Sequence, residues 1–374
     1  MNSFGRLLRF HLFGESHGAG VGCVVDGLPP GMPIDVGRIQ AALDRRRPGQ
    51  SSMTTARQEP DQVEIRSGAH RGRATGAPVA LWIANADARS KHYDNIRRVP
   101  RPGHADFTGH VRGRGWGDPR GGGHFSGRLT APLVAAGALA AELLEAHGIG
   151  VGAHLHGVAD VAGPFGLIDV ETMHSAAGGN QLQTGHTALV ERFTAIVEAA
   201  RKDGDSVGGI VAFRAEGLGV GLGEPWADSV ESHLAHLLFA IPAVKGVDFG
   251  AGFDAVAMRG SAHNDPWLPD ADAIARPATN HAGGILGGLT SGAPLQGRVA
   301  IKPTSSIFQP QQSVDLTTGE AATLELKGRH DPLIAIRAVP VVEAAVAFAL
   351  ADLWLVHAAE RAAAAAWPKG DDPR

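Results

Sequence analysis

Apolar and polar residues alternate along the chain in segments whose lengths predict both strands and helices. Short apolar segments predict strands at Val21–Val25, Val79–Ile83, Gly209–Ala215 and Arg298–Lys302. Longer segments predict helices at Val36–Arg46, Thr130–His147, Ala195–Lys202, Val230–Phe239 and Val339–Ala366. Pro48 should stop the first helix and Gly148 should cap the second. The pattern indicates a mixed α/β protein.

Two stretches between these elements are long, polar and rich in glycine, at Arg97–Gly127 and Asn280–Gln312. Long stretches of this kind inside a compact domain are usually functional or disordered, and their His, Arg, Asp and Ser residues favour functional loops. No linker-like change of composition divides the chain. We therefore expect one intertwined domain over residues 1–374, with a flexible tail at 367–374.

Charge and composition narrow the class of ligand and the compartment. The chain has 374 residues and a formal net charge of −4, which disfavours nucleic acid as the main partner. Arginines nevertheless cluster in the first third, as in Arg45–Arg47, which suits a small anionic ligand. Cys23 is the only cysteine, so we expect a buried thiol and a cytoplasmic protein.

Neither end of the chain reads as a membrane or export segment. Arg6, Arg9 and His11 interrupt the apolar residues at the start, so no signal peptide is expected. The apolar stretch from 339 to 355 contains Glu343 and Asp352. Charged residues at these positions favour a buried or oligomer-facing helix over a membrane span.

The segment Gly14–Gly18 fits the G-x-S-x-G pattern of a serine-hydrolase nucleophile. That pattern requires a strand before the serine and a helix after it. Here a predicted strand follows Ser16, so a hydrolase is disfavoured. His17 is a candidate proton donor, and the alternative is a histidine that only hydrogen-bonds within a turn.

Three further segments carry groups that suit an anion. His104 lies in an arginine-flanked turn, where an imidazole can protonate a departing oxyanion, although a plain surface histidine is the commoner case. Arg120–Arg128 is a glycine-rich loop that leads into a helix, a favourable place for phosphate. Lys302–Ser306 offers a cation and hydroxyls, with a capping loop as the alternative.

Other nucleotide and metal motifs are missing from the sequence. There is no G-x-x-x-x-G-K-[ST] phosphate loop and no G-x-G-x-x-G dinucleotide fingerprint, which disfavours a Rossmann domain. No group of His, Cys, Asp and Glu has metal-ligand spacing, so no metal site is expected.

Taken in order, the motifs resemble the chorismate synthase family from about Phe4 to Leu355. The segments that carry the resemblance are Gly14–Gly18, Asp44–Gly49, Glu59–Val63, Arg101–Asp106, Ser126–Arg128, Gly204–Gly209, Pro242–Gly246, Asn280–Gly288, Lys302–Ser306 and Gly328–Pro332 with Arg337–Pro340. The resemblance implies a homotetramer whose subunit is a β-α-β sandwich, an α+β arrangement of helices between antiparallel sheets. It also implies elimination of phosphate from 5-enolpyruvylshikimate 3-phosphate to give chorismate, with reduced FMN and no net redox change.

The resemblance also implies residue roles. It assigns catalysis to His17, His104, Asp331, Ser16 and Ser126. Contacts with substrate or NADP fall on Arg46, Ser52, Arg128 and Arg329. Contacts with FMN fall on His124, Phe125, Ser126, Pro242, Ala243, Gly287, Lys302, Pro303, Thr304, Ser305, Ser306 and Arg329.

Several positions depart from the family pattern. His124 and Phe125 stand where the family usually has arginine and serine, and Ser52 stands where it usually has arginine. A histidine replaces the positive charge only when protonated. Leu333 replaces a usual cysteine, and 109–116 lacks the family's Lys-Tyr-Gly.

Two other functions remain open at this point. One is a serine hydrolase acting through Ser16, and the other is a non-catalytic protein that binds FMN or an anion. Because no dinucleotide fingerprint is present, we expect the flavin to be reduced by an outside reductant.

Overall fold

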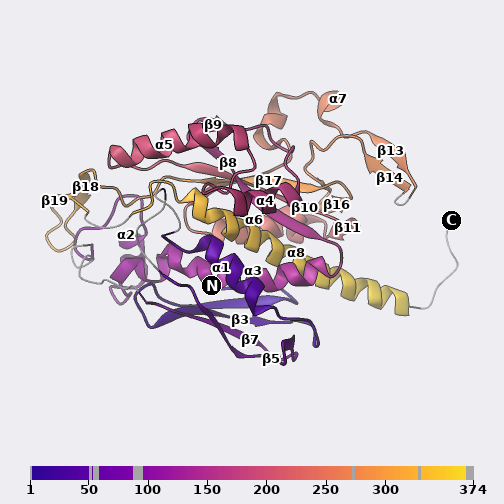
Figure 1. Ribbon diagram of the computed structural model, residues 1–374, viewed down its shortest axis with the longest axis horizontal. Helices are drawn as coiled ribbons and strands as arrows, with labels where there is room; N and C mark the ends of the chain where they lie inside the picture. The colour runs from indigo at the N-terminus through magenta and orange to yellow at the C-terminus, as the bar shows by residue number, and fades with distance from the viewer. Residues whose placement is uncertain are drawn as a thin grey trace.

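The computed structural model describes residues 2–49, 53, 59–86, 96–271, 274–326 and 330–367. Helices are packed between two five-stranded antiparallel sheets (Figure 1). The first sheet has the order β1-β2-β3-β7-β4, formed by Ser3–Phe4, Arg9–Gly14, Gly20–Asp26, Val79–Ala84 and Val63–Ser67. The second has the order β12-β17-β10-β8-β9, formed by Val244–Phe249, Leu295–Ile301, Gly209–Glu216, Gly150–Val158 and Val161–Ala162.

The helical layer is built around α3 (Thr130–Glu145) and α8 (Ala335–Ala366), which pack against each other. Both are apolar on nearly every side, as expected of helices covered on all faces. Helix α3 contacts β3 and β7 of the first sheet, and α8 contacts β8 and β10 of the second. Helices α1 (Val36–Arg46) and α6 (Val230–Ala240) complete the layer. The predicted sandwich is confirmed.

Shorter elements cover the edges of the two sheets. Helices α4 (Val170–Gly179) and α5 (Val190–Lys202) contact β8. The remaining helices are α2 (Asp106–Arg112) and α7 (Gly260–His263), with 3₁₀ turns η2 (Arg120–Phe125), η3 (Gly127–Leu129), η4 (Thr187–Leu189), η5 (Trp226–Asp228) and η6 (Gly252–Ala257). The remaining strands are β5 (Ala69–His70), β6 (Arg73–Ala74), β11 (Val220–Gly223), β13 (Trp267–Asp270), β14 (Ile274–Pro277), β15 (Ile285–Leu286), β16 (Leu289–Ser291), β18 (Gln311–Val314) and β19 (Ala321–Leu324).

The long elements agree with the sequence predictions. Helix α1 has the predicted bounds, and its N-terminus is capped by Asp35, whose side chain accepts a hydrogen bond from the Gly37 amide at 2.8 Å. Helix α8 begins four residues before the predicted Val339. The two glycine-rich stretches hold more regular structure than expected, namely α2 and η2 in the first and β15 and β16 in the second. Strand β17 confirms the strand predicted at Arg298–Lys302 but begins at Leu295. Of the predicted tail, residues 368–374 lie outside the described part.

Pro340 lies inside α8 and cannot donate the backbone hydrogen bond that would reach the Ile336 carbonyl. The side-chain amide of Gln183 supplies it, because Gln183 Nε2 lies 3.2 Å from Ile336 O. The same nitrogen lies 3.2 Å from Arg45 O, near the end of α1. One buried glutamine therefore joins α1, α8 and the loop between α4 and η4.

The start of the chain is anchored on α8. Asp352 is fully buried and accepts hydrogen bonds from the backbone amides of Arg6, Leu7 and Leu8 at 2.8 to 3.0 Å. Two helical segments, 127–145 and Ala335–Ala366, are long and apolar enough to span a membrane. In each, 78% of the most apolar stretch of 18 residues is buried inside the protein, as in core helices of globular proteins.

Candidate active site

A cavity of about 730 Å³ opens between the first sheet, the helical layer, the loop before β12 and the loop after β17. Its volume is that of a site for a small ligand or cofactor. The predicted site residues that line it are Arg46, His104, His124, Phe125, Ser126, Arg128, Pro242, Ala243, Lys302, Thr304, Ser305, Ser306 and Asp331. Residues distant in sequence thus meet at one place.

The glycine loop lies between the two candidate histidines. Gly121 and Gly122 have φ of 61° and 82°, a conformation that favours glycine. A Cβ on Gly121 would lie 2.4 Å from the His17 ring, and one on Gly122 would lie 3.1 Å from the His104 ring. The missing side chains therefore let the loop pack against both imidazoles.

His17 and Ser16 lie behind the cavity wall rather than in it. Both are buried, at 7% and 0% exposure. The Ser126 hydroxyl, which lines the cavity, lies 3.2 Å from Ser16 Oγ and donates a hydrogen bond to it. Ser16 sits in a turn between β2 and β3, not between a strand and a helix. Its burial and its setting both disfavour the hydrolase.

His104 is oriented by a carboxylate. His104 Nδ1 lies 2.7 Å from Asp106 Oδ1, so the Nδ1–H donates to Asp106, and Arg101 Nη2 lies 3.3 Å from His104 Nε2. Arg101 binds the same carboxylate through Nε and Nη2, at 2.7 and 2.8 Å. Burial would raise the pKa of Asp106, but hydrogen bonds from Arg101 and His104 hold it well below its usual range. Asp106 thus stays ionised beside the imidazole.

Two arginines of the cavity share one buried carboxylate. Asp61 contacts Arg46 Nη1 at 2.7 Å and also pairs with Arg128 Nη1. Burial would raise the pKa of Asp61, but the charges of Arg46 and Arg128 outweigh this and lower it. Burial lowers the pKa of Arg46 to about 9, aided by Arg337 and Arg128, so it is still charged at neutral pH. The pair presents one net positive charge to the cavity.

Asp331 is held from two sides. Arg337 Nη1 donates to its carboxylate at 2.9 Å, and the Thr304 hydroxyl donates to its backbone carbonyl at 2.9 Å. Arg337 Nε also donates to Arg46 O at 3.1 Å. The carboxylate is therefore fixed relative to Arg46 and to the Lys302–Ser306 loop.

The Lys302–Ser306 loop presents its polar groups along one wall. Lys302 Nζ donates to Ser305 Oγ at 2.7 Å, and Ser305 Oγ donates to Gly103 O at 2.7 Å. Burial and the charge of Lys245 lower the pKa of Lys302. The Lys302 amide donates to Ala243 O at 3.0 Å, and Ala243 has φ of 73°. Strained backbone of this kind is common at ligand sites.

His124 bridges the first two strands at the cavity rim. Its Nδ1 lies 3.0 Å from Gly14 O, and its Nε2 lies 3.0 Å from Asn2 Oδ1. These two contacts tie the ring to the backbone at the end of β2 and to the residue before β1. Phe125 next to it is half exposed and packs on Gly109.

Besides Ser16 and His17, two predicted residues that the structure describes do not line the cavity. Gly287 lies between β15 and β16, and Pro303 is flanked by two residues that do line it. Ser52 and Arg329 lie outside the described residues. Conversely, Asp61, Asp106 and Arg337 lay within quoted motifs but were given no role. Their partners reveal that role, and those partners are known only once the chain is folded.

The cavity is positively charged although the protein is not. Among the residues that the structure describes, its charged lining consists of six cations, Arg46, Arg101, Arg128, Arg337, Lys245 and Lys302, and two carboxylates, Glu59 and Asp331. Apolar side chains such as Leu133, Leu237 and Val341 form another part of the wall. An apolar wall beside a polar, cationic edge suits a flat heterocycle that carries a phosphate. The residues present therefore fit a flavin mononucleotide and an anionic substrate.

Comparisons with known proteins agree on one family. The family model described as chorismate synthase matches residues 8–355. A chorismate synthase of Bordetella petrii is 47% identical over 360 residues, covering 96% of this chain and 99% of that protein. One of Thermococcus kodakarensis is 47% identical over 351 residues, covering 93% and 96%. A crystal structure of chorismate synthase matches with a TM-score of 0.74 at 26% identity, covering 94% of this chain and 93% of that one.

Proposed function

Because the chain belongs to the chorismate synthase family, it is a lyase of the shikimate pathway to aromatic amino acids, and we propose that the cavity works with reduced FMN. The reaction removes phosphate and a ring proton from 5-enolpyruvylshikimate 3-phosphate. The C–O bond breaks with its electron pair on phosphate, the C–H bond breaks, and a new double bond forms. Oxidation state is unchanged overall. When bound, reduced FMN supplies electron density to the substrate while phosphate leaves, and it is not consumed.

His104 is the proton donor to the departing phosphate. The observation that carries this role is the short contact between His104 Nδ1 and the ionised Asp106, at 2.7 Å. A carboxylate at Nδ1 stabilises the imidazolium and orients the ring, which lines the cavity. Arg101, bound to the same carboxylate, places a permanent charge where an anion would leave.

Arg46, Arg128 and Arg337 hold the carboxylates and the phosphate of the substrate. Each already has at least one ordered partner, so little side-chain freedom is lost on binding. Ser52 and Arg329 keep their predicted place among these contacts. Asp331 and Ser126 face the part of the substrate from which the ring proton leaves. Ser16 is hydrogen-bonded to Ser126 from behind.

The cofactor is held by the opposite wall. Lys302 and the hydroxyls of Thr304, Ser305 and Ser306 bind its polar edge, while Pro242, Ala243 and Phe125 cover its ring. His124 contacts the cofactor from the rim, and Pro303 and Gly287 shape the backbone nearby. His17 holds a proton behind Gly121, where it balances the negative charge of the reduced cofactor.

We also propose a cytoplasmic homotetramer that depends on an outside flavin reductant. Large apolar side chains that are almost fully exposed support self-association, among them Trp226 at 93% and Ile274 at 88%. The missing dinucleotide fingerprint supports the outside reductant.

The test is anaerobic turnover of the purified chain with dithionite-reduced FMN. We expect chorismate from the wild-type protein and about 100-fold less from His104→Ala, as for loss of a general acid. His110→Ala, an exposed histidine on α2, is the matched control and should turn over normally. Binding of FMN and substrate without phosphate release would instead favour a non-catalytic binding protein. Full activity in His104→Ala would remove the proposed role of that residue.

A further inference from the structure

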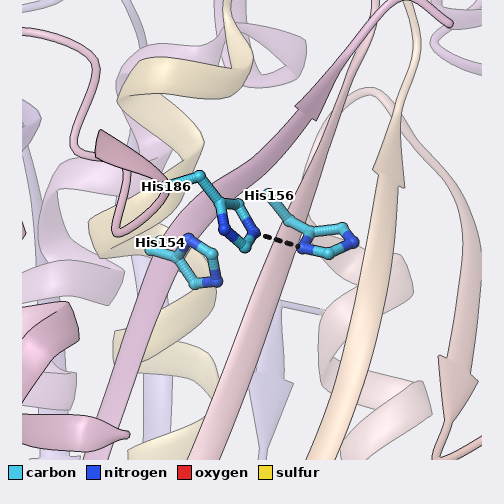
Figure 2. A group of neighbouring side chains, drawn as sticks. All are labelled: His154, His156 and His186. Atoms are coloured by element: carbon cyan, nitrogen blue, oxygen red, sulfur yellow. Dashed lines mark hydrogen bonds between the residues drawn. The ribbon is translucent and has the colours of Figure 1, made fainter. Parts of the chain in front are cut away.

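Three histidine side chains meet beside the second sheet, away from the cavity (Figure 2). His154 and His156 come from β8, and His186 precedes η4. Their exposures are 2%, 2% and 7%. One ring nitrogen of each lies within 4.8 Å of one ring nitrogen of each of the others. The burial of three imidazoles at one place therefore requires a physical explanation.

The fold brings them together through a bulge and a loop contact. In the pairing of β8 with β10, Leu155 faces Val211 and Gly157 faces Ile210, so His156 is an extra residue. Such a bulge redirects its side chain. The Leu155 amide donates to Gln183 O at 2.9 Å, which ties the loop carrying His186 to β8. A Cβ on Gly163 would lie 2.4 Å from the His186 ring, so the backbone after β9 fixes that ring.

The three rings are neutral at physiological pH. Burial lowers the pKa of His154 to about 3 and that of His156 to about 4, and it also lowers the pKa of His186. The neutral imidazole is the form that binds metal ions. Arg298 lies near His156, but its charge is balanced by Asp248 at 2.7 Å.

A purely structural role explains only part of the arrangement. His156 Nδ1 and His186 Nε2 lie 3.1 Å apart and share one hydrogen bond. His154 Nδ1 accepts a weak bond from the Gly185 amide at 3.3 Å. The hydrogen bond between His156 and His186 needs only those two residues. The His154 ring nevertheless packs edge-on against His186, with 4.9 Å between the ring centroids. Three nitrogens in one place are the donor set of tetrahedral zinc sites.

We propose that His154, His156 and His186 bind one divalent transition-metal ion of the zinc type, each through one ring nitrogen. In a tetrahedral site with Zn–N of about 2.1 Å, the nitrogens lie roughly 3.4 Å apart. The His156–His186 separation of 3.1 Å is already close to this, and His154 needs only a small ring movement. Water takes the fourth position, because no carboxylate or thiolate of the described residues joins the group.

The ion would act as a structural clamp. It pins the loop between α4 and η4 to β8, and that loop carries Gln183, which holds the ends of α1 and the start of α8. The spacing of the histidines hid this site in the sequence, since His186 follows His156 by thirty residues. The expectation of no metal site, drawn from spacing, is therefore replaced by this proposal.

The test is a titration of the full chain with Co²⁺, which replaces Zn²⁺ and absorbs visible light when bound in a tetrahedral site. The protein is prepared without a histidine tag and stripped with a chelator. We expect absorption bands that saturate at one Co²⁺ per chain and disappear when Zn²⁺ is added. His154→Asn and His186→Asn should each weaken binding by about 100-fold or more, since loss of a supporting contact alone costs 10- to 100-fold. His174→Asn, an exposed histidine on α4, should bind as the wild type does.

A second measurement covers variants that fold poorly. Zn²⁺ in excess should raise the Tm of the wild type and of His174→Asn, because an ion that binds only the folded state stabilises it. The Tm of His154→Asn and His186→Asn should not change. A wild-type chain without a saturable one-to-one site overturns the proposal whatever the variants do. Binding that is unaltered in both histidine variants also overturns it.

Discussion

At the scale of single residues, His330, the neighbour of Asp331 in sequence, is a histidine that the fold keeps uncharged. Its ring packs against Phe308 at 5.4 Å between centroids. Its Nε2 is buried and has no hydrogen-bond partner among the residues that the structure describes. Burial, aided by the charge of Arg101, lowers the pKa of His330 to about 4. The residue is therefore neutral when the enzyme works.

This pKa predicts a loss of stability in acid. The unfolded chain takes up a proton at His330 near pH 6.5, and the folded chain does so only near pH 4. Between these values the unfolded state binds more protons, so the free energy of unfolding falls as the pH is lowered through this window. We expect His330→Gln to reduce the slope by up to about 1.4 kcal/mol per pH unit. Urea unfolding from pH 7 to pH 4 measures it, and an unchanged slope would show that His330 titrates normally.

Site residues that lie in a local motif could be predicted from the sequence. The residues that hold them in place through long-range contacts could not. His104 and Arg128 lie in recognisable segments, and both line the cavity. Asp61 matters because α1 and η3 bring two arginines to it, and those arginines are 15 and 67 residues away in sequence. Spacing along the chain holds no information about such long-range pairs.

At the scale of elements, the long helices could be predicted from local signals, whereas the short strands could not. Helix α1 was predicted to the residue because its apolar periodicity and its stop before Pro48 are local signals. Strands β11, β15 and β16 were not predicted, because each has only two to four residues and is held by its pairing partner. Helix α2 was not predicted, because Gly109 and the polar residues of this segment are typical of a loop.

The link between Gln183 and Pro340 can be measured as a coupling energy. Gln183→Ala leaves Ile336 O and Arg45 O without their side-chain donor, and we expect a loss of about 1–3 kcal/mol. Pro340→Ala restores a backbone N–H that can reach Ile336 O. In that background Gln183→Ala should therefore cost less. Urea unfolding of the two single variants and the double variant tests this.

The control for that cycle is Gln309→Ala, which removes an exposed amide bound to Asp203 O at 3.1 Å. It should lose little stability and show no coupling with Pro340→Ala. Strict additivity between Gln183→Ala and Pro340→Ala would mean that the glutamine does not compensate for the proline.

At the scale of the whole molecule, a chain with net charge −4 places six cations and two carboxylates around one cavity. Low-dielectric walls concentrate such a field at the mouth of the cavity. An anionic substrate is therefore drawn to the site even though the protein as a whole repels it weakly. The attraction acts during approach and is screened by salt.

We expect kcat/KM for the substrate to fall as NaCl is added, while kcat changes little. Lys245→Gln should make the dependence on salt shallower, because it removes one cation from the lining. Lys202→Gln, at the end of α5 and outside the cavity, should leave the dependence unchanged. Steady-state kinetics of the wild type and both variants at increasing NaCl concentration measure this dependence. A kcat/KM that does not respond to salt would exclude electrostatic attraction of the substrate.

The position of α8 in the chain has a consequence for how the protein is made. A ribosome completes both sheets and α3 before it begins α8, yet α8 is the helix that α3, β8 and β10 pack against. The amides of residues 6–8 find their acceptor, Asp352, only when the chain is 344 to 346 residues longer. Until then the nascent chain exposes apolar faces on both layers, the condition under which chains aggregate or recruit chaperones. Synthesis of the final helix is thus the step that closes the core and completes the cavity together.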